Sequence, residues 1–383
     1  MRFTDALAAP GFGAIAEFKR RSPSAGDIRP DGDVTVIGPA YEAAGARAMS
    51  VLVDERFGGT WDDLRAARSS TSLPLLAKGF FSTPEHLREA RDAGADAALL
   101  LLRDLDDATC VALMREAESL GLDTLVEAHD AAEVERAIAL AAPVVGVNAR
   151  DLATFSIDRR AQLELLKLIP DDRVVIAESG IATAAQAAAA ELSGANAVLV
   201  GSTLMRAPDP GDALRALLRR PLVKVCGLTR QDDVDAAVEA GADLLGFIFA
   251  DFSPRRAERI LEAPDTVLRV AVVVGETDDR GADLVQLYAA ENGTRAKDAT
   301  LLQDGRQVAS VVDLPWLEDD PTHLDRARAT PGRLMLAGGL GPDNVRQAID
   351  EVHPWAVDSA RSTEREPGIK DHEKVRAWVE ATR

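Results

Sequence analysis

A short sequence pattern recurs along this chain: a helical stretch ends in Gly-Ala and a polar residue, and a short apolar run follows. The pattern occurs at residues 44–47, 93–96, 193–196 and 240–243. Glycine adopts the left-handed conformation that closes a helix C-terminus, and buried parallel strands read as nearly continuous apolar runs. Helices that alternate with such strands predict βα units around a parallel sheet.

The number of apolar runs narrows the fold class. The runs that precede residue 203 are numerous enough for a (β/α)8 barrel, and they also fit a doubly wound sheet of the same strand number. The expected strands are 14–19, 48–54, 73–79, 96–102, 123–129, 143–148, 174–181 and 197–202.

Polar residues distinguish these two folds. Most of the expected strands end at, or run into, a polar residue or a glycine. An open sheet binds ligands mainly at one switch point, whereas a barrel gathers all its strand ends around one mouth. The pattern therefore favours the barrel. The chain also holds no G-x-G-x-x-G or G-x-x-x-x-G-K-[ST] motif, so nucleotide-binding motifs give the open sheet no support.

The alternation of helices and apolar strands is interrupted over residues 203–222 and resumes with a strand at Val223. We therefore expect two domains, 1–220 and 221–383. Residues 299–313 read as two strands around Asp304-Gly305, a hairpin signal, and this half is shorter than the usual barrel. The predicted architecture is α/β, two tandem (β/α)8 TIM barrels, the second compressed and irregular. Its other expected strands are 223–228, 244–250, 269–275, 284–288, 333–339 and 356–361.

Composition excludes several function classes. The net charge is −19 and no Lys/Arg cluster stands out against it, so we expect no nucleic acid partner. No apolar run approaches the ~20 residues of a membrane span, and the N-terminus lacks the apolar core of a signal peptide. The 2 cysteines lie far apart, and the 5 histidines show no metal-ligand spacing. We expect a cytoplasmic monomer without a metal or other cofactor.

Charged residues at the strand ends of the first half suit acid–base chemistry. Glu17 and Lys19 are two residues apart and share one strand face, while Lys78, Glu127 and Glu178 end the third, fifth and seventh strands. Buried charges in a barrel mouth are costly unless they are paired or used. Structural ion pairing at a barrel rim is the alternative interpretation.

Glycines at the strand ends predict phosphate sites in both halves. Ser179-Gly180 and Gly201-Ser202 end the last two strands of the first half, where barrels often bind phosphate through backbone N–H groups. Gly338-Gly339 and the polar run 358–362 repeat this arrangement in the second half. The residues therefore indicate two phosphorylated ligands, although tight βα turns need glycine anyway.

Two further residues could carry chemistry in the second half. Cys226 is expected to point inward from the first strand of that half, and Asp313 ends the VVD run. A thiolate base and a carboxylic acid across a barrel mouth would suit proton shuttling between adjacent carbons. A buried cysteine that serves only as a small apolar side chain is the alternative.

The first half resembles the indole-3-glycerol-phosphate synthase family. The motifs are IAEFKRRSPSAGDI (15–28), LVEAHD (125–130), VGVNARDL (145–152), AESGI (177–181) and AVLVGSTLM (197–205). The resemblance implies that Lys78 is the general acid and Glu127 the base, and that Lys19 holds the substrate carboxylate and assists ring closure. It also implies substrate contacts and a phosphate site, formed by Glu17, Asn148, Arg150, Glu178 and Ser179 and by Ser22, Gly180, Gly201 and Ser202 respectively.

The second half is similar to the phosphoribosylanthranilate isomerase family. The motifs are VKVCGLTR (223–230), FSPRR (252–256), LVQL (284–287), LAGGLGPDNV (336–345) and PGIKD (367–371). The resemblance implies Cys226 as base, Asp313 as acid and Arg255 as a substrate contact. The expected phosphate-binding residues of this half are Gly338, Gly339, Arg361 and Ser362.

Together the two resemblances imply a bifunctional enzyme of tryptophan biosynthesis. Its isomerase half would rearrange phosphoribosylanthranilate to carboxyphenylamino-deoxyribulose phosphate, and its synthase half would close that product to indole-3-glycerol phosphate. The chain begins almost at the first strand, where the family synthases carry an N-terminal extension. In the second half, Tyr288 replaces the family's histidine, and Leu314-Pro315-Trp316 replaces a glycine-rich loop.

Two alternatives stay open, the first of them because of these departures. In the first, only the synthase half is active and the second half is a weakly active or structural module. In the second, both barrels bind sugar phosphates without catalysis.

Overall fold

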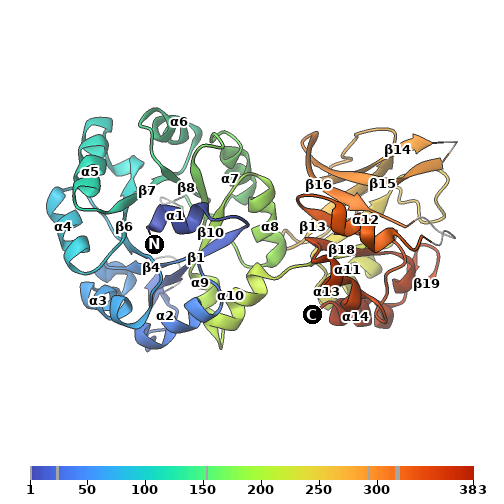
Figure 1. Cartoon of the computed structure of the whole chain (residues 1–383), viewed down its shortest axis with the longest axis horizontal. Helices are drawn as coiled ribbons and strands as arrows, with labels where there is room; N and C mark the ends of the chain where they lie inside the picture. The colour runs from blue at the N-terminus through green and yellow to red at the C-terminus, as the bar shows by residue number, and fades with distance from the viewer. Residues whose placement is uncertain (1, 23–25, 152–153, 292–293, 315–319) are drawn as a thin grey trace. The chain divides into compact units, whose positions relative to one another are not determined.

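The computed structural model describes residues 2–22, 26–151, 154–291, 294–314 and 320–383. The chain divides into two compact units, which comprise 1–182 with 187–218, and 183–186 with 219–383. Figure 1 follows both units from the blue N-terminus to the red C-terminus. The predicted Pro315 and Trp316 lie outside the described residues.

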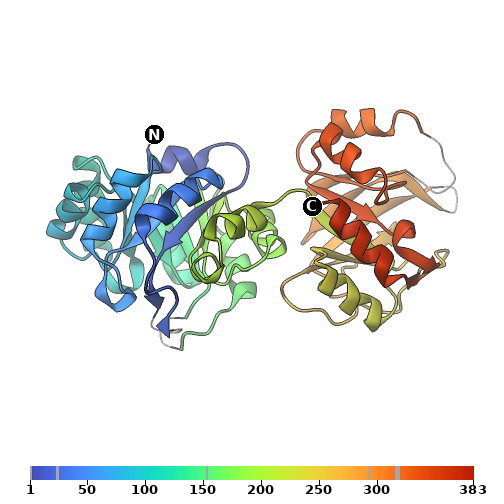
Figure 2. The same cartoon turned by 90° about the horizontal axis from the view of Figure 1, so that it is seen from below.

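The first unit contains a closed parallel barrel in the order β1-β10-β9-β8-β7-β6-β5-β4. Its strands are β1 (Gly13–Phe18), β4 (Ala48–Leu52), β5 (Leu75–Lys78), β6 (Ala97–Leu101), β7 (Asp123–Ala128), β8 (Val144–Asn148), β9 (Val174–Glu178) and β10 (Ala197–Val200). Each corresponds to a strand expected from the sequence, so the barrel prediction is confirmed. A hairpin of β2 (Arg21–Ser22) and β3 (Gly26–Asp27), dark blue in Figure 2, follows β1.

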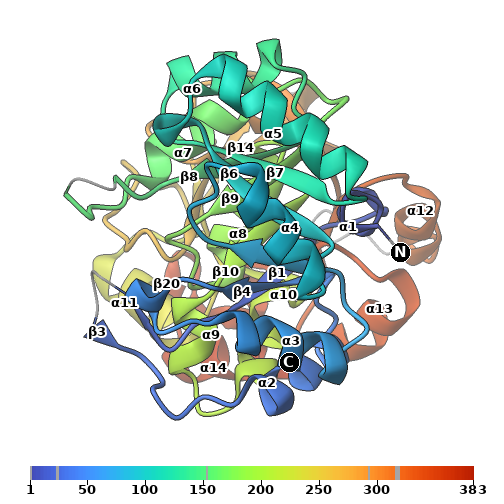
Figure 3. The same ribbon diagram turned by 90° about the vertical axis from the view of Figure 1, so that its left-hand side faces the viewer.

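Helices surround this barrel, and Figure 3 shows several of them outside its strands. They are α1 (Phe3–Ala8), α2 (Val34–Ala43), α3 (Trp61–Ser70), α4 (Pro84–Asp92), α5 (Asp107–Ser119), α6 (Ala131–Ala139), α7 (Arg159–Leu166), α8 (Ala184–Leu192), α9 (Ser202–Arg206) and α10 (Pro210–Leu218). Asp side chains cap the N-termini of several, as Asp106 does at α5 by accepting a bond from the Thr109 N–H. Gly94 follows α4 with φ +95°, the left-handed ending that the repeated pattern predicts.

The second unit also contains a closed barrel, in the order β11-β12-β13-β14-β15-β16-β17-β18. Its strands are β11 (Leu222–Cys226), β12 (Leu244–Ile248), β13 (Leu268–Val274), β14 (Leu284–Glu291), β15 (Thr294–Gln303), β16 (Arg306–Val312), β17 (Leu334–Leu336) and β18 (Ala356–Ser359). Its described helices are α11 (Gln231–Ala240), α12 (His323–Ala329), α13 (Val345–Val352) and α14 (His372–Ala381). A two-stranded sheet of β19 (Glu364–Glu366) and β20 (Ile369–Lys370) follows β18.

The irregularity of the second barrel lies at β14 to β16. These strands follow one another through two hairpins and pair antiparallel, where the first barrel has helical crossovers. The hairpin at Asp304-Gly305 is therefore confirmed. The first hairpin extends the prediction, because β14 continues beyond residue 288 and β15 begins at Thr294. The apolar residues that mark 299–303 as a strand are scarce over 294–298, where charged residues cluster, so the start of β15 was not predicted.

Two separate apolar cores support these barrels. Ala, Val and Leu side chains dominate the first core, which includes Met49 and Leu75, while Trp378 of α14 anchors the second. Figure 1 shows α11 near α14 on the lower side of the second barrel and β14 with β15 on the upper side. None of the helices in the described part of the chain has the length and apolar character needed to span a membrane.

Candidate active sites

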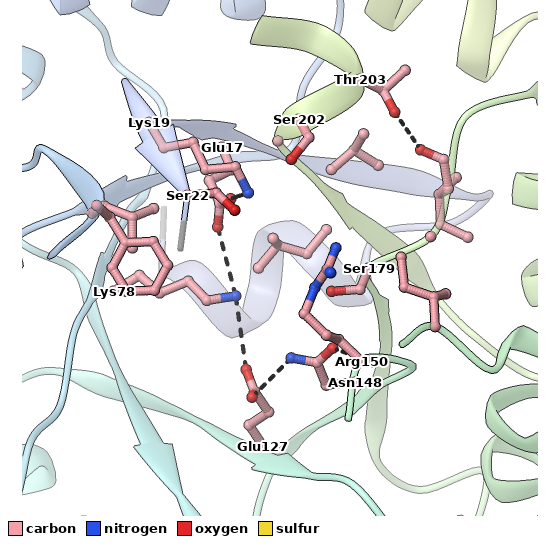
Figure 4. A pocket seen from close by; sticks show the side chains of 18 of the residues that line it. Glu17, Lys19, Ser22, Lys78, Glu127, Asn148, Arg150, Ser179, Ser202 and Thr203 are labelled. Carbon is pink, nitrogen blue, oxygen red and sulfur yellow. Dashed lines mark hydrogen bonds and ion pairs between the residues drawn. The ribbon is translucent and has the colours of Figure 1, made fainter. Parts of the chain in front are cut away.

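The first barrel opens into a cavity of about 530 Å³ at the carboxyl ends of its strands (Figure 4). Almost every residue that the sequence nominates in this half lines it. These residues are Glu17, Lys19, Ser22, Lys78, Glu127, Asn148, Arg150, Ser179, Gly180, Gly201 and Ser202. Glu178 is the exception, since its fully buried side chain is not part of the lining and contacts Lys78 instead.

Lys78, at the end of β5, lies among three buried carboxylates. Its Nζ donates a hydrogen bond of 2.6 Å to Glu178 Oε2, and lies 3.6 Å from Glu17 Oε2 and 3.7 Å from Glu127 Oε2. Figure 4 shows Lys78 reaching between Glu17 and Glu127. Burial disfavours the ammonium form, but the three carboxylates outweigh it and raise the pKa of Lys78. The lysine is therefore a protonated donor inside the cavity.

Glu178 and Glu127 occupy opposite protonation states. Burial, reinforced by the negative charge of Glu127, raises the pKa of Glu178 to about 8. Burial also opposes ionisation of Glu127, but Lys78 and His129 outweigh it and lower the pKa of Glu127. Glu178 Oε1 and Glu127 Oε2 are both buried without a hydrogen-bond donor. A proton on Glu178 supplies the missing hydrogen-bond donor. Glu178 is therefore the neutral member of the pair, and Glu127 is the ionised member.

Polar groups fix the orientation of Glu127. Asn148 Nδ2 donates to Glu127 Oε1 at 3.0 Å, and His129 Nε2 lies 3.1 Å from the same oxygen. On its other side, His129 Nδ1 lies 3.2 Å from Glu133 Oε2. Burial disfavours the imidazolium, but Glu127 and Glu133 raise the pKa of His129 to about 9. Glu127 is thus an oriented, ionised base with a cationic neighbour.

Glu17 and Lys19 form a second charged pair on β1 and the residue after it. Lys19 Nζ lies 2.7 Å from Glu17 Oε1. Burial disfavours the Glu17 carboxylate, but Lys19 and then Lys78 outweigh it, so the pKa of Glu17 is lowered. A Cβ atom at Gly201 would lie 2.3 Å from Glu17 Oε1, so glycine at this position leaves room for the carboxylate.

The ends of β9 and β10 form the other side of the cavity. Ser179 and Gly180 both adopt positive φ, +67° and +73°, in the turn after β9. Gly201 and Ser202 follow β10 at the start of α9, and Ser22 lines the cavity from the β2–β3 hairpin. The structure thus brings together the four turn residues and Ser22 that the sequence nominates for phosphate.

Apolar side chains that were not predicted from the sequence also line the cavity. They include Phe57, Phe80, Phe155 and Ile157. All lie in segments outside the barrel strands, and periodicity distinguishes no role for such residues. They add apolar lining beside the charged residues of the cavity, which suits an aromatic ring.

The second barrel has a larger cavity, of about 1040 Å³. Its lining includes all the candidate site residues that were predicted from the sequence of this half. These are Cys226, Arg255, Asp313, Gly338, Gly339, Arg361 and Ser362.

Cys226, at the end of β11, lies beside a fully buried lysine. Lys224 Nζ lies 3.4 Å from Cys226 Sγ and donates to Gln286 Oε1 at 2.7 Å and to Asp358 Oδ2 at 2.8 Å. Burial and the charge of Asp358 raise the pKa of the Cys226 thiol to about 11. Burial also raises the pKa of Asp358.

Asp313, after β16, accepts two hydrogen bonds at one oxygen. Tyr288 Oη and Arg295 Nη2 each donate to Asp313 Oδ2 at 2.8 Å. The Arg295 guanidinium also lies 4.1 Å from the centre of the Tyr288 ring. Gln286 Nε2 donates to Tyr288 Oη at 2.7 Å, which connects Asp313 to the Lys224 cluster. Arg295 comes from β15, so the irregular hairpin contributes directly to the cavity.

Arg255 and Ser362 have defined side-chain partners in the second cavity. Arg255 forms a bidentate pair with Glu364, with contacts of 2.8 Å from Nε and 2.8 Å from Nη2. Gly338 and Gly339 both have positive φ after β17. Ser362 Oγ lies 2.6 Å from Ser359 Oγ.

The sequence reading assigned no role to Lys224, Gln286 and Arg295. Lys224 stands two residues before Cys226 and Gln286 two before Tyr288, so the two-residue strand period could have placed both beside those residues. Arg295 lies in the hairpin that was not predicted. In the part of the chain that the structure describes, no three His, Cys, Asp or Glu residues are grouped to hold a metal ion.

Two family models match this chain. The model described as indole-3-glycerol phosphate synthase matches residues 1–217. The model described as N-(5'phosphoribosyl)anthranilate (PRA) isomerase matches residues 289–381.

Individual proteins match the first half and the whole chain. An indole-3-glycerol phosphate synthase from a Nocardioides species is 47% identical, over 55% of this chain and 81% of its own length. A multifunctional tryptophan biosynthesis protein from Schizosaccharomyces pombe is 30% identical, over 96% of this chain and 59% of its own length. The crystal structure of phosphoribosyl anthranilate isomerase from Thermotoga maritima is 27% identical, with a TM-score of 0.34, over 43% of this chain and 98% of that one.

Proposed function

This chain belongs to the indole-3-glycerol phosphate synthase family, and from that premise we propose which residues carry its chemistry. It is a bifunctional enzyme of tryptophan biosynthesis, with synthase and phosphoribosylanthranilate isomerase activities. The isomerase converts phosphoribosylanthranilate to carboxyphenylamino-deoxyribulose phosphate. The synthase closes that product to indole-3-glycerol phosphate, with loss of carbon dioxide and water. We assign residues 1–220 to the synthase and 221–383 to the isomerase.

In the synthase, Lys78 is the general acid and Glu127 the general base. The single observation that carries this assignment is the position of the Lys78 ammonium among three buried carboxylates, 3.7 Å from Glu127. Ring closure requires a proton for the oxygen that leaves as water, and Lys78 is the protonated group within the cavity. It also requires removal of a proton, and ionised Glu127 is oriented for this by Asn148.

Neighbouring residues hold the substrate of the synthase. Lys19 binds the anthranilate carboxylate, and Glu17 keeps its ammonium in the cavity through their 2.7 Å contact. Asn148 and Arg150 contact the substrate, and Glu178 and Ser179 complete this set, Glu178 acting through Lys78. Backbone N–H groups at Gly180, Gly201 and Ser202, with Ser22, receive the phosphate.

In the isomerase, Cys226 is the base and Asp313 the acid. Both line one cavity and belong to the same hydrogen-bonded network. Arg255, held by Glu364, contacts the substrate, while Gly338, Gly339, Arg361 and Ser362 bind the phosphate. The alternative of a structural second half has no feature in its favour, because the nominated residues all line the cavity.

The remaining assignments concern the setting of the enzyme. Two free cysteines suit a reducing compartment, so we place the enzyme in the cytoplasm. It acts as a monomer, and a net charge of −19 disfavours nucleic acid as a partner. Light scattering after gel filtration would test the monomer, since a mass of twice 40.8 kDa would contradict it.

A variant in each half tests the residue assignments. Glu127→Gln removes the synthase base without changing its size, so indole-3-glycerol phosphate formation should fall by a factor of about 10²–10⁴. Isomerisation of phosphoribosylanthranilate by the same variant should be unchanged. Exposed Glu135→Gln is the matched control and should retain both rates. Synthase turnover by Glu127→Gln close to that of the unmodified enzyme would overturn the assignment.

A further inference from the structure

The second cavity contains a buried cluster whose charges the proposed acid and base do not explain. Lys224 is fully buried and donates to Asp358 Oδ2 at 2.8 Å. Its Nζ also lies 3.4 Å from Cys226 Sγ. Asp358 Oδ1 is buried without a hydrogen-bond donor, and Asp358 lines the cavity. A carboxylate with one paired and one unpaired oxygen can accept a further proton.

We propose that Asp358 stores the thiol proton of Cys226, which Lys224 transfers, so that the thiolate forms without a change in the net charge of the cluster. This inference rests on the proposed role of Cys226 as the isomerase base. Lys224 first gives a proton to Asp358 Oδ2 and becomes a neutral amine. The amine then takes the proton from Cys226 Sγ, which leaves a thiolate, an ammonium and a neutral carboxylic acid.

The charge balance of the cluster favours this route. Before the transfer, the cluster holds one ammonium, one carboxylate and a neutral thiol, and afterwards one ammonium, one thiolate and a neutral acid. Losing the thiol proton to water would add an uncompensated negative charge at a buried position, which is costly. Internal transfer exchanges one anion for another beside the same ammonium.

The cycle returns the stored proton. The thiolate takes a proton from the sugar carbon next to the nitrogen-bearing carbon and becomes a thiol again. The Cys226 thiol then gives a proton to the nitrogen-bearing carbon as the ketone forms, and Asp358 returns its stored proton through Lys224 to the thiolate, so that Asp358 is a carboxylate again. The enol hydroxyl meanwhile returns a proton to Asp313, which gave one to the ring oxygen. The three acids thus end the cycle as they began it.

Other charged groups near Cys226 do not offer the same route. Lys370 Nζ donates to the backbone oxygen of Cys226 at 2.6 Å and to the Ala360 oxygen at 2.8 Å, which fixes it on the backbone. Glu364 lies 3.4 Å from Lys370 and is held by Arg255. Among the described residues, Lys224 is the cation whose Nζ contacts both the Cys226 sulfur and the Asp358 carboxylate.

The pH dependence of thiol alkylation tests this proposal directly. Iodoacetamide is applied to the full chain carrying Cys110→Ala, and modification of Cys226 is followed by mass spectrometry. Internal transfer moves no proton to water, so the alkylation rate should be nearly constant between about pH 6 and about pH 8. In Asp358→Asn the proton must leave to water, so the rate should rise about tenfold for each pH unit.

Isomerase turnover supplies the second readout. Asp358→Asn should lower isomerase kcat by about 10²-fold near pH 6, with recovery as the pH rises, while exposed Asp350→Asn should behave like its parent. A tenfold rise per pH unit in the alkylation rate of the parent itself would overturn the proposal, and this result does not depend on whether Asp358→Asn folds. Full isomerase activity in Cys226→Ala would instead refute the proposed base, which is a separate outcome.

Discussion

Replacing Glu178 by glutamine should change how the stability of the first barrel depends on pH. Glutamine has the shape of a protonated glutamate, so it can accept the bond from Lys78 and donate to Glu127 Oε2, which has no donor. The ordinary pKa of glutamate is 4.5, and in the folded chain the pKa of Glu178 is raised to about 8. The folded state therefore holds a proton there that the unfolded state has already lost.

The sign and size of the effect follow from proton linkage. A raised pKa contributes stability that is fully present below the unfolded value and is lost as the pH rises through the folded value. Between these values the unmodified protein loses about 1.4 kcal/mol for each pH unit through this group, and the glutamine variant does not. From about pH 6 to about pH 8, the stability of Glu178→Gln relative to its parent should rise by about 2–3 kcal/mol.

Hydrogen exchange in increasing urea gives the local free energy of unfolding. Amides of β8, β9 and β10 report on the first barrel alone, and comparing both proteins at the same pH cancels the intrinsic exchange rates. Exposed Glu135→Gln should show the same pH dependence as the parent. A stability difference between Glu178→Gln and its parent that stays constant across this pH range would refute the reasoning, because it would mean that Glu178 is ionised throughout.

Three further substitutions have defined outcomes. His129→Gln removes the cation beside Glu127, so the pKa of the base rises, synthase kcat falls about tenfold and the acid limb of its pH–rate profile moves to higher pH; an unmoved limb would contradict this. Tyr288→Phe removes a hydrogen bond to Asp313, so isomerase kcat should fall about tenfold while the synthase rate is retained, and equal losses in both assays would contradict it. Lys19→Met should raise the synthase KM about tenfold or more by removing a charge-assisted contact, and an unchanged KM would show that Lys19 does not bind substrate.

The barrels were predictable because each strand carries its own signal. The apolar runs that end in polar residues identified the first barrel, and Asp304-Gly305 identified the hairpin that makes the second irregular. The hairpin between β14 and β15 was not predicted, because charged residues over 294–298 obscure the strand alternation. Charged side chains of this segment line the second cavity instead, where Arg295 donates a hydrogen bond to Asp313.

The positions of the site residues were predictable from the sequence, but their protonation states were not. Strand ends placed Lys78, Glu127 and Glu178 at one mouth, yet only the contacts separate neutral Glu178 from ionised Glu127. That difference arises from Lys78, which reaches both glutamates only after folding, and from His129, which stands two residues after Glu127. The same holds for Lys224, whose link to Asp358 joins the first and last strands of its barrel.

The central claim is that each barrel carries one reaction with its own acid and base. The most direct measurement supplies phosphoribosylanthranilate to the full chain and follows carboxyphenylamino-deoxyribulose phosphate and indole-3-glycerol phosphate over time. The Lys78→Met variant should accumulate carboxyphenylamino-deoxyribulose phosphate and form no indole-3-glycerol phosphate. Cys226→Ala should form neither, yet should convert added carboxyphenylamino-deoxyribulose phosphate at the unmodified rate. Indole-3-glycerol phosphate from Lys78→Met, or undiminished isomerisation by Cys226→Ala, would contradict the account.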